Sequence, residues 1–292
     1  MAIEAGGTPQ DVCTMANPMR PTQSHPHTDL DLRWPASALW RDGDPKVRTI
    51  TTADIWESLR EGIDDFRAMP THYFFAIAIY PVVGIILARL LFGYELLPLV
   101  YPMAAGFTLL GPFVAIGLYE LSRRREQGLD ISPARAFDVL HRPGIDSIFT
   151  LGAILALVFV GWVYIANVMY FQIMGSEPTS FSDFVKQVTT TDRGMQLIYA
   201  GNLVGFLFAA VVLVTTVVSF PMLVDRDVGV GAAVRTSVRA ALENPVPIAL
   251  WGLIVALGLL LGALPFLIGL AVVLPILGHA TWHLYRKVVV TP

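Results

Sequence analysis

Long apolar runs constrain the fold of this chain more than any other feature of its sequence. Four windows have the length of about 20 residues that crosses a bilayer as a helix, and they cover residues 72–92, 96–118, 146–170 and 198–222. A fifth run, from 246 to 285, can turn at the Gly262–Pro265 segment, so we expect two short helices over 246–263 and 267–285. With 54% hydrophobic and 15% charged residues, the chain lies outside the soluble globular range. The sequence predicts an all-α membrane protein with six transmembrane helices.

The lysine and arginine positions predict the direction of these helices. All but three of the 20 basic residues lie in segments on one side, and the exceptions are Arg89, Lys186 and Arg193. Basic residues gather in cytoplasmic loops, so we expect both termini in the cytoplasm. Residues 1–50 have no apolar run, which predicts a disordered tail and neither a signal peptide nor an anchor. The six-helix domain is expected over residues 51–292.

A proline late in an apolar run, followed by a basic exit, occurs three times. The first and third copies align without a gap, so Arg123 matches Arg286, and Glu120 takes the position of His283. The repeat predicts three helical hairpins of one ancestral type. Its signature residues are Pro112, Glu120, Arg123, Pro221, Asp225, Pro275, His279, His283 and Arg286.

Each predicted hairpin follows a short segment with apolar residues at helical spacing. These segments cover residues 55–68, 133–142 and 230–243, and each ends just before a proline. Charged residues occupy their other faces, a pattern typical of helices that lie at a membrane surface. We therefore expect a cytoplasmic amphipathic helix before every hairpin.

His279 and His283 are the sharpest candidates for chemistry, because they lie one turn apart on one helical face. This spacing can present two imidazoles to a metal ion or a cofactor. No third His, Cys or carboxylate is near them in sequence, and the neighbouring Trp282, Tyr285 and Arg286 are typical of a helix end at the headgroups. Interfacial anchoring and hydrogen bonding are the favoured interpretation, with metal binding as the alternative.

Two carboxylates lie at the matching exits of the other copies. Glu120 can relay a proton, but Arg123 one turn later favours an ion pair. Asp225 is suited to capping the segment that follows it. An enzyme would need these two carboxylates to converge with His279 and His283.

Polar residues inside the third and fourth predicted helices allow two interpretations. Such residues usually form hydrogen bonds between helices. The alternative is a polar path through the membrane, lined by Asn167, Asn202 and Thr216.

Several function classes are disfavoured by what the sequence lacks. The net charge of −3 and the absence of a basic block give no reason to expect a nucleic acid partner. The single Cys13 has no partner for an intramolecular disulfide. No P-loop, GxSxG, HExxH or dinucleotide motif occurs, so we expect neither an enzyme nor a bound cofactor.

Three stretches carry a family resemblance. They are the pattern Trp56-x-x-Leu-x-x-Gly62-x-x-Asp65, the stretch Ala105–Arg123 and the ending Pro275–Arg286. Together they resemble a bacterial family of predicted integral membrane proteins catalogued as a domain of unknown function. The resemblance covers roughly residues 50–290. It implies six passes and an inner-membrane location, and it brings no established activity.

Some members of that family carry an automatic label of cytochrome c oxidase subunit I. The residues of this chain argue against such chemistry. That subunit uses a dozen helices and six intramembrane histidines, whereas this chain has 6 histidines in all, two of them in the predicted tail.

The favoured function is a non-catalytic structural, assembly or accessory subunit of a membrane complex. Besides the lipid bilayer, its expected partner is a membrane protein that contacts the cytoplasmic amphipathic helices. The alternative is a small-molecule or lipid permease with a path between the three hairpins.

Overall fold

The computed structural model describes residues 43–69, 71, 97–175, 180–265 and 267–290. All of them belong to one compact unit, Leu39–Pro292. The named elements of this part of the chain are helices, which confirms the all-α prediction there. The predicted helix over 72–92 and the predicted tail up to residue 42 lie outside the described residues.

The first half of the described chain contains one separate helix and one interrupted helix. α1 begins after Thr51, whose backbone N–H donates to Asp54 Oδ2 at 2.7 Å, as expected for a capping box. The chain from 97 to 126 changes helix type next to Pro112, which lacks the N–H that a continuous ladder needs. The elements are α1 (Thr52–Ala68), α3 (Leu97–Phe107), η2 (Thr108–Leu110), α4 (Gly111–Val114), α5 (Ile116–Glu126) and the 3₁₀ helix η3 (Pro133–His141).

The second half contains the longest helices. A break after Thr216 separates α8 from α9, which contains Pro221, whereas α12 continues through Pro275. Two of the three repeated prolines therefore lie beside a helix break, and the third lies inside a continuous helix. The elements are α6 (Ile145–Met174), α7 (Phe181–Thr190), α8 (Asp192–Thr216), α9 (Ser219–Asp225), α10 (Gly229–Glu243), α11 (Pro245–Ala263) and α12 (Leu270–Val288).

Four helical segments of the described chain are long and apolar enough to cross a membrane. They are Leu97–Glu126, Ile145–Met174, Asp192–Asp225 and Pro245–Ala263, and they coincide with four of the six predicted spans. α12 is not among them, because polar and charged residues occupy its second half. Six crossings, the hairpin arrangement and the cytoplasmic placement of the termini stay predictions.

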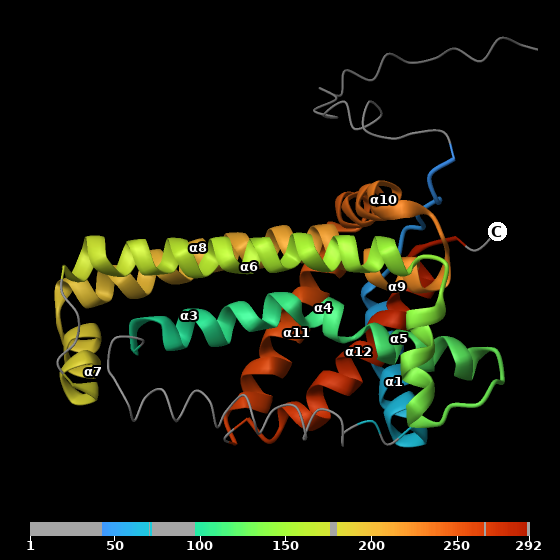
Figure 1. Cartoon of the computed structure of the whole chain (residues 1–292), viewed down its shortest axis with the longest axis horizontal. Coiled ribbons are helices and arrows are strands. Elements are labelled where there is room, and N and C mark those ends of the chain that lie inside the picture. The colour runs from blue at the N-terminus through green and yellow to red at the C-terminus, as the bar shows by residue number, and fades with distance from the viewer. Residues whose placement is uncertain (1–42, 70, 72–96, 176–179, 266, 291–292) are drawn as a thin grey trace, which may run out of the picture. The chain divides into compact units, whose positions relative to one another are not determined.

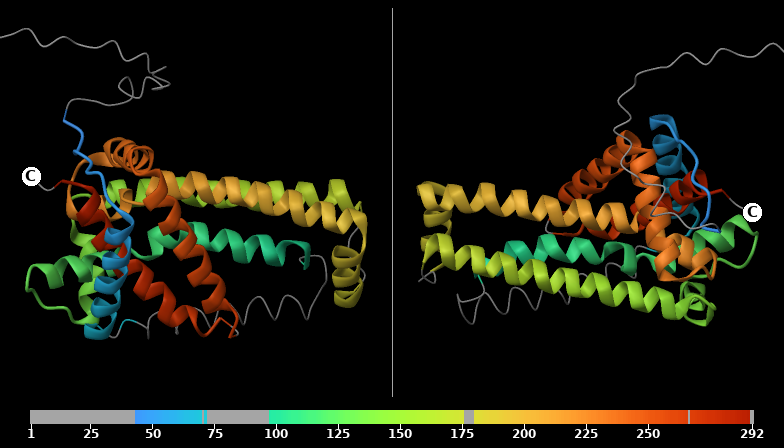
Figure 2. Two further views of the ribbon diagram at one scale, coloured as in Figure 1. Left: turned by 180° about the vertical axis from the view of Figure 1, so that it is seen from behind. Right: turned by 90° about the horizontal axis from the view of Figure 1, so that it is seen from above.

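The helices pack in two distinct groups. α6 and α8 lie side by side, and α7 joins their ends and runs across them (Figure 1). α1 packs along α12 near the opposite ends of α6 and α8 (Figure 2). This contact is close, because a Cβ atom added at Gly62 of α1 would lie 2.5 Å from the backbone N of Ala280 in α12.

The predicted amphipathic helices bury a face of small and polar residues. In α1, Ser58, Gly62 and Asp65 are buried, whereas Leu59 and Ile63 stay half-buried. α10 repeats this arrangement, since its buried face is Ala233, Thr236, Ser237, Ala240 and Ala241. Of the apolar stripe on α1, Ile55 is fully buried. The apolar stripe that suggested an interfacial face on α10 is not the buried side of that helix. The third predicted helix, 133–142, is the 3₁₀ helix η3.

Residues 43–50, at the end of the predicted tail, are held against the folded unit. Val47 and Val289 form an isolated antiparallel bridge, and the Ile50 N–H donates to Asn244 Oδ1 at 2.7 Å. Asp44 forms an ion pair with Arg235 at 2.7 Å. These contacts hold the segment before α1 against the segment that follows α12 and against Arg235 and Asn244.

Candidate functional site

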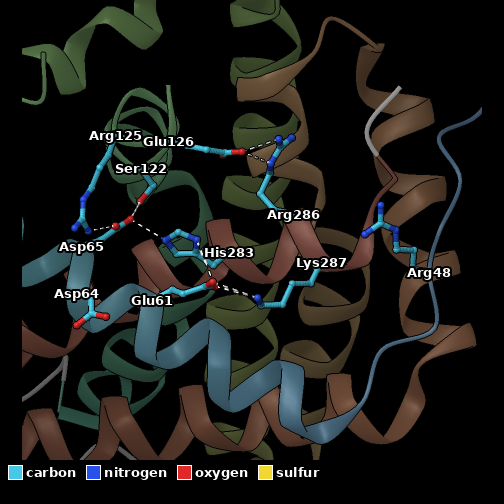
Figure 3. A pocket seen from close by; sticks show the side chains of 10 residues that line it. All are labelled: Arg48, Glu61, Asp64, Asp65, Ser122, Arg125, Glu126, His283, Arg286 and Lys287. Atoms are coloured by element: carbon cyan, nitrogen blue, oxygen red, sulfur yellow. Dashed lines mark hydrogen bonds and ion pairs between the residues drawn. The ribbon is translucent and has the colours of Figure 1, made fainter. Parts of the chain in front are cut away.

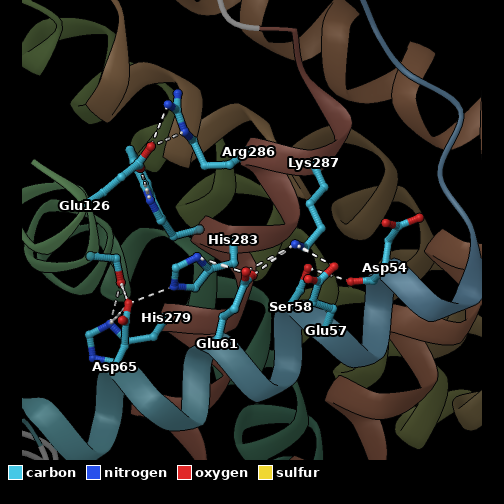
Figure 4. A network of polar contacts seen from close by, with 12 residues as sticks. Asp54, Glu57, Ser58, Glu61, Asp65, Glu126, His279, His283, Arg286 and Lys287 are labelled. Atoms are coloured by element: carbon cyan, nitrogen blue, oxygen red, sulfur yellow. Dashed lines mark hydrogen bonds and ion pairs between the residues drawn. The ribbon is translucent and has the colours of Figure 1, made fainter.

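Helices α1, α5 and α12 meet at a polar cluster centred on Asp65 (Figure 4). The Asp65 residue is only 3% exposed. Its Oδ2 accepts a hydrogen bond from Ser122 Oγ at 2.5 Å and lies 2.9 Å from His283 Nε2. Its Oδ1 accepts from the Arg125 guanidinium. One buried carboxylate thus connects three helices.

His279 extends this cluster inward. Its Nδ1 lies 2.8 Å from Ser122 Oγ, and its Nε2 lies 3.5 Å from Thr71 Oγ1. Because Ser122 donates its single hydroxyl proton to Asp65, Nδ1 of His279 is the donor to Ser122, which leaves Nε2 as an acceptor.

This order of groups differs from that of a nucleophilic triad. In such a triad the imidazole lies between the hydroxyl and the carboxylate and removes the hydroxyl proton. Here the Ser122 hydroxyl lies between His279 and Asp65 and is itself buried. Ser122 is therefore positioned as a hydrogen-bond bridge between two side chains.

Charged groups continue along α1 and α12 in a regular antiparallel series. Lys287 Nζ lies 3.0 Å from Glu57 Oε2 and 3.2 Å from Glu61 Oε2. His283 Nδ1 lies 3.6 Å from Glu61 Oε2. The acids Glu57, Glu61 and Asp65 are spaced one turn apart, and so are Lys287, His283 and His279 on the facing helix. We name these six residues the α1–α12 ladder.

A second set of contacts joins α12 to α5 and α9. Arg286 donates to Glu126 Oε1 at 2.7 and 3.0 Å, and Trp282 Nε1 donates to the other oxygen of Glu126 at 3.2 Å. Asp225 accepts from Tyr285 at 2.6 Å and from Arg286 at 3.4 Å. Asp225 therefore binds α12, in place of the predicted cap for the following helix.

Glu120 lies apart from the ladder and pairs with Arg123, as the sequence suggested. The guanidinium makes two hydrogen bonds to the carboxylate, at 2.7 and 2.9 Å, and Glu120 is buried. Both groups are held in this bidentate pair. In the structure, His279 and His283 contact Asp65 and Glu61, whereas Glu120 and Asp225 have other partners.

An open pocket of about 570 Å³ lies beside the ladder (Figure 3). Its lining mixes both signs of charge, so no single sign dominates it. The lining residues are Arg48, Glu61, Asp64, Asp65, Ser122, Arg125, Glu126, His283, Arg286 and Lys287.

The polar contacts determine the charge of the ladder. Burial by itself raises the pKa of the Asp65 carboxyl, but hydrogen bonds from His283 and Ser122 and the charge of His283 outweigh it and hold that pKa below its usual range. Burial likewise opposes the charge of Lys287, yet Glu57 and Glu61 raise the pKa of its ammonium group. Both groups are therefore charged near neutral pH.

No group of three or more His, Cys, Asp or Glu residues in the described ranges is arranged to hold a metal ion. In the same ranges, every buried side-chain nitrogen or oxygen of a residue that is not exposed has a hydrogen-bond partner. The cluster as described is a set of mutually paired groups. Metal binding at His279 and His283 stays a prediction without a described third ligand.

Asn167, Asn202 and Thr216 do not line the pocket described above. Thr216 is buried and donates to the Val212 carbonyl of its own helix at 2.6 Å. Asn202 accepts a hydrogen bond from Tyr101 of α3 at 2.8 Å. The bond between α3 and α8 is of the interhelical type expected from sequence, and the polar path stays a prediction.

Comparison with known proteins identifies a family. Residues 100–225 match the family model described as predicted integral membrane protein (DUF2189). The match confirms the resemblance seen in the sequence, and it brings no catalytic description. No curated protein and no solved structure matches the chain. The helices α1 and α12 lie outside the matched range.

Proposed function

We propose that this member of the DUF2189 family of predicted integral membrane proteins is a structural, assembly or accessory subunit of a membrane complex. We place it in the bacterial inner membrane with both termini in the cytoplasm. One observation carries the proposal, namely that polar and charged side chains of the α1–α12 ladder pair with one another within this chain.

Because the side chains of the ladder pair with one another, they favour a structural role, in which they hold helices together, over a catalytic role. A general acid or base needs access to a substrate proton, and a nucleophile needs a base oriented toward it. Asp65 instead accepts from Ser122, His283 and Arg125, and Ser122 gives its proton to a carboxylate. The contact with His283 joins α1 to α12, 218 residues away, and the contacts with Ser122 and Arg125 join α1 to α5.

The outer faces of α1 and α10 are the surface we assign to a protein partner. Trp56 is 57% exposed on α1, and Leu242 is similarly exposed on α10. Aromatic side chains with a large exposed apolar area are frequent anchors in protein interfaces. The ladder leaves this face of α1 directed away from α12.

Purification in mild detergent tests the proposal. We expect a membrane protein to co-purify in a fixed ratio with the full chain, and we expect the Trp56→Ala variant to lose it while remaining folded. The matched control is Tyr164→Ala, an exposed aromatic residue on α6, which should retain the partner. A solitary protein that catalyses substrate uptake in proteoliposomes would contradict the proposal and favour a permease.

A further inference from the structure

The α11–α12 hairpin differs from the other long helices in its turn. Residues 245–278 contain no charged residue and no Ser, Thr, Asn or Gln. The turn itself is therefore as apolar as the helices on either side. Leu264 at the turn is 70% exposed, and the neighbouring Leu260, Leu261 and Ile268 are also exposed.

The second limb of the hairpin is too short to cross the hydrocarbon. From Leu270 to Gly278 the helix α12 rises about 13 Å at 1.5 Å per residue, whereas the hydrocarbon core is about 30 Å thick. His279 begins the polar half of α12, where it contacts Ser122. A turn at the outer surface would draw this polar half into the hydrocarbon.

The partners of α12 make that deeper position unfavourable. Glu126, which binds Arg286, keeps a side-chain exposure of 40%, and Glu57, which binds Lys287, keeps 60%. Exposed charged groups of this kind are costly in hydrocarbon and favourable at the headgroups or in water. The ladder thus places the end of α12 outside the hydrocarbon.

The backbone of the turn is suited to an apolar medium. Leu264 N–H donates to Leu260 O at 3.2 Å, Leu267 N–H to Ala263 O at 3.0 Å, and Ile268 N–H to Pro265 O at 3.0 Å. Pro265 has no N–H to satisfy. Internal pairing of backbone groups is the condition for placing a turn in hydrocarbon.

Two glycines let the limbs meet at this turn. A Cβ atom at Gly269 would lie 2.8 Å from the carbonyl oxygen of Gly262. Leu267 has a positive φ of 66°, a left-handed conformation that closes the chain on itself. The hairpin is therefore compact at its tip, without a polar loop.

We propose that α11 and α12 form a re-entrant hairpin that enters the bilayer from the cytoplasmic side and turns inside the hydrocarbon. Its tip, residues 260–265 and 267–268, contacts lipid acyl chains. The turn then lies about 13 Å from the inner boundary, close to the middle of the bilayer. Both ends of the hairpin remain on the cytoplasmic side, as predicted from the basic residues.

Cysteine labelling tests the position of the tip. In a Cys13→Ser background, we compare Leu264→Cys with Lys186→Cys on α7 and Glu243→Cys at the end of α10. A membrane-impermeant maleimide should label Lys186→Cys from outside and Glu243→Cys from the cytoplasmic side. It should label Leu264→Cys from neither side. Labelling of Leu264→Cys from outside at the rate of Lys186→Cys would overturn the proposal, and so would labelling from the cytoplasmic side.

A depth measurement separates lipid contact from burial in protein. An environment-sensitive fluorophore on Leu264→Cys, in vesicles of phosphatidylethanolamine and phosphatidylglycerol, is quenched by lipids carrying a nitroxide at different depths. We expect the strongest quenching from nitroxides deep in the acyl chain. Strongest quenching from headgroup nitroxides would overturn the proposal, as would no quenching at all, because the tip would then be covered by another part of the chain or by a second copy. Ile268→Cys provides an independent second position.

Discussion

The α6–α8 pair and the α1–α12 ladder have opposite patterns of burial. Along α6 and α8, large apolar side chains are exposed, for example Leu157, Tyr164 and Phe206. In the ladder, charged and polar residues such as Asp65 and His279 are buried. A protein surrounded by water would show neither pattern to this extent. The difference indicates that the surrounding medium changes from hydrocarbon to water along the molecule.

The same difference in burial indicates which interactions hold each region together. Between lipid-exposed helices the hydrophobic effect is weak, so close packing and hydrogen bonds must contribute. In the apolar region, Trp162 of α6 donates to the Pro102 carbonyl of α3 at 2.7 Å and packs against glycines. In the ladder, charged groups give the contact between α1 and α12 its register. The ladder can therefore specify which helices meet, whereas the apolar region specifies where lipid lies.

Separating α1 from α12 should have the largest effect. Gly62→Leu places a side chain against the Ala280 backbone, so we expect a loss of about 3 kcal/mol in the free energy of unfolding, at the upper end for overpacking. Gly161→Leu on α6 is the matched control, because no atom lies within 4 Å of its added Cβ. Denaturation in mixed detergent micelles measures both. Equal stability of the two variants would show that the close contact is dispensable.

A charge introduced into the apolar region should have a slightly smaller effect. Leu157 is 72% exposed near the middle of α6, and moving a lysine into the middle of a bilayer costs about 2.5 kcal/mol on an insertion scale. Leu157→Lys should therefore reduce the fraction of protein recovered in membranes. Trp56→Lys on the exposed face of α1 should leave that fraction unchanged. If both variants insert normally, the assignment of α6 to lipid is wrong.

Removing the central carboxylate should have an intermediate effect. Asp65→Ala leaves Ser122, His283 and Arg125 without their shared acceptor, which we expect to cost about 2 kcal/mol because Arg125 is partly exposed to water. Unfolding of purified protein in detergent measures the loss. Asp64→Ala, which removes the neighbouring but exposed carboxylate, should change stability by less than about 0.5 kcal/mol. A similar loss in both variants would mean that burial of Asp65 contributes little.

Lowering the pH should have the smallest effect on stability. The fold lowers the pKa of Asp65, so its ionised carboxylate stabilises the folded state fully above the unfolded-state pKa of about 4 and progressively less as the pH falls below it. The stability difference between wild type and Asp65→Asn should therefore shrink as the pH falls below that value. Denaturation curves at several pH values check this. A difference that grows on acidification would contradict the lowered pKa.

The spacing of apolar residues predicted a helix well where its bounds depend on the residues of that segment alone. The bounds of α1, α6, α10 and α11 agree closely with the predicted ranges. The pairing of Glu120 with Arg123 was also visible, because the two residues lie on one helical face. The repeat predicted hairpins and not helix breaks, although Pro112 and Pro221 lie beside such breaks and Pro275 lies inside a continuous helix.

The centre of the site could not be predicted in the same way. In the sequence, Asp65 stood out only as one residue of the pattern that resembles a family. The apolar stripe on α1 directed the prediction to the apolar face of this helix, and not to the face that carries Asp65. Its partner His283 is 218 residues away, and no local pattern encodes that contact. The one available signal was the equal spacing of Glu57, Glu61 and Asp65 and of Lys287, His283 and His279, read in opposite directions.

The contact between the first described helix and the last has a consequence for synthesis. α1 is translated before the other described helices, yet most of its helix contacts are with α12, the last of them, and Asp65 also contacts α5. A truncated product that stops before α12 lacks the Lys287 partner of Glu57 and Glu61, although Arg125 of α5 can still pair with Asp65. This contact can close only after α12 has been translated, so an intact α1–α12 pair distinguishes a chain that includes α12 from every nascent chain that stops before it.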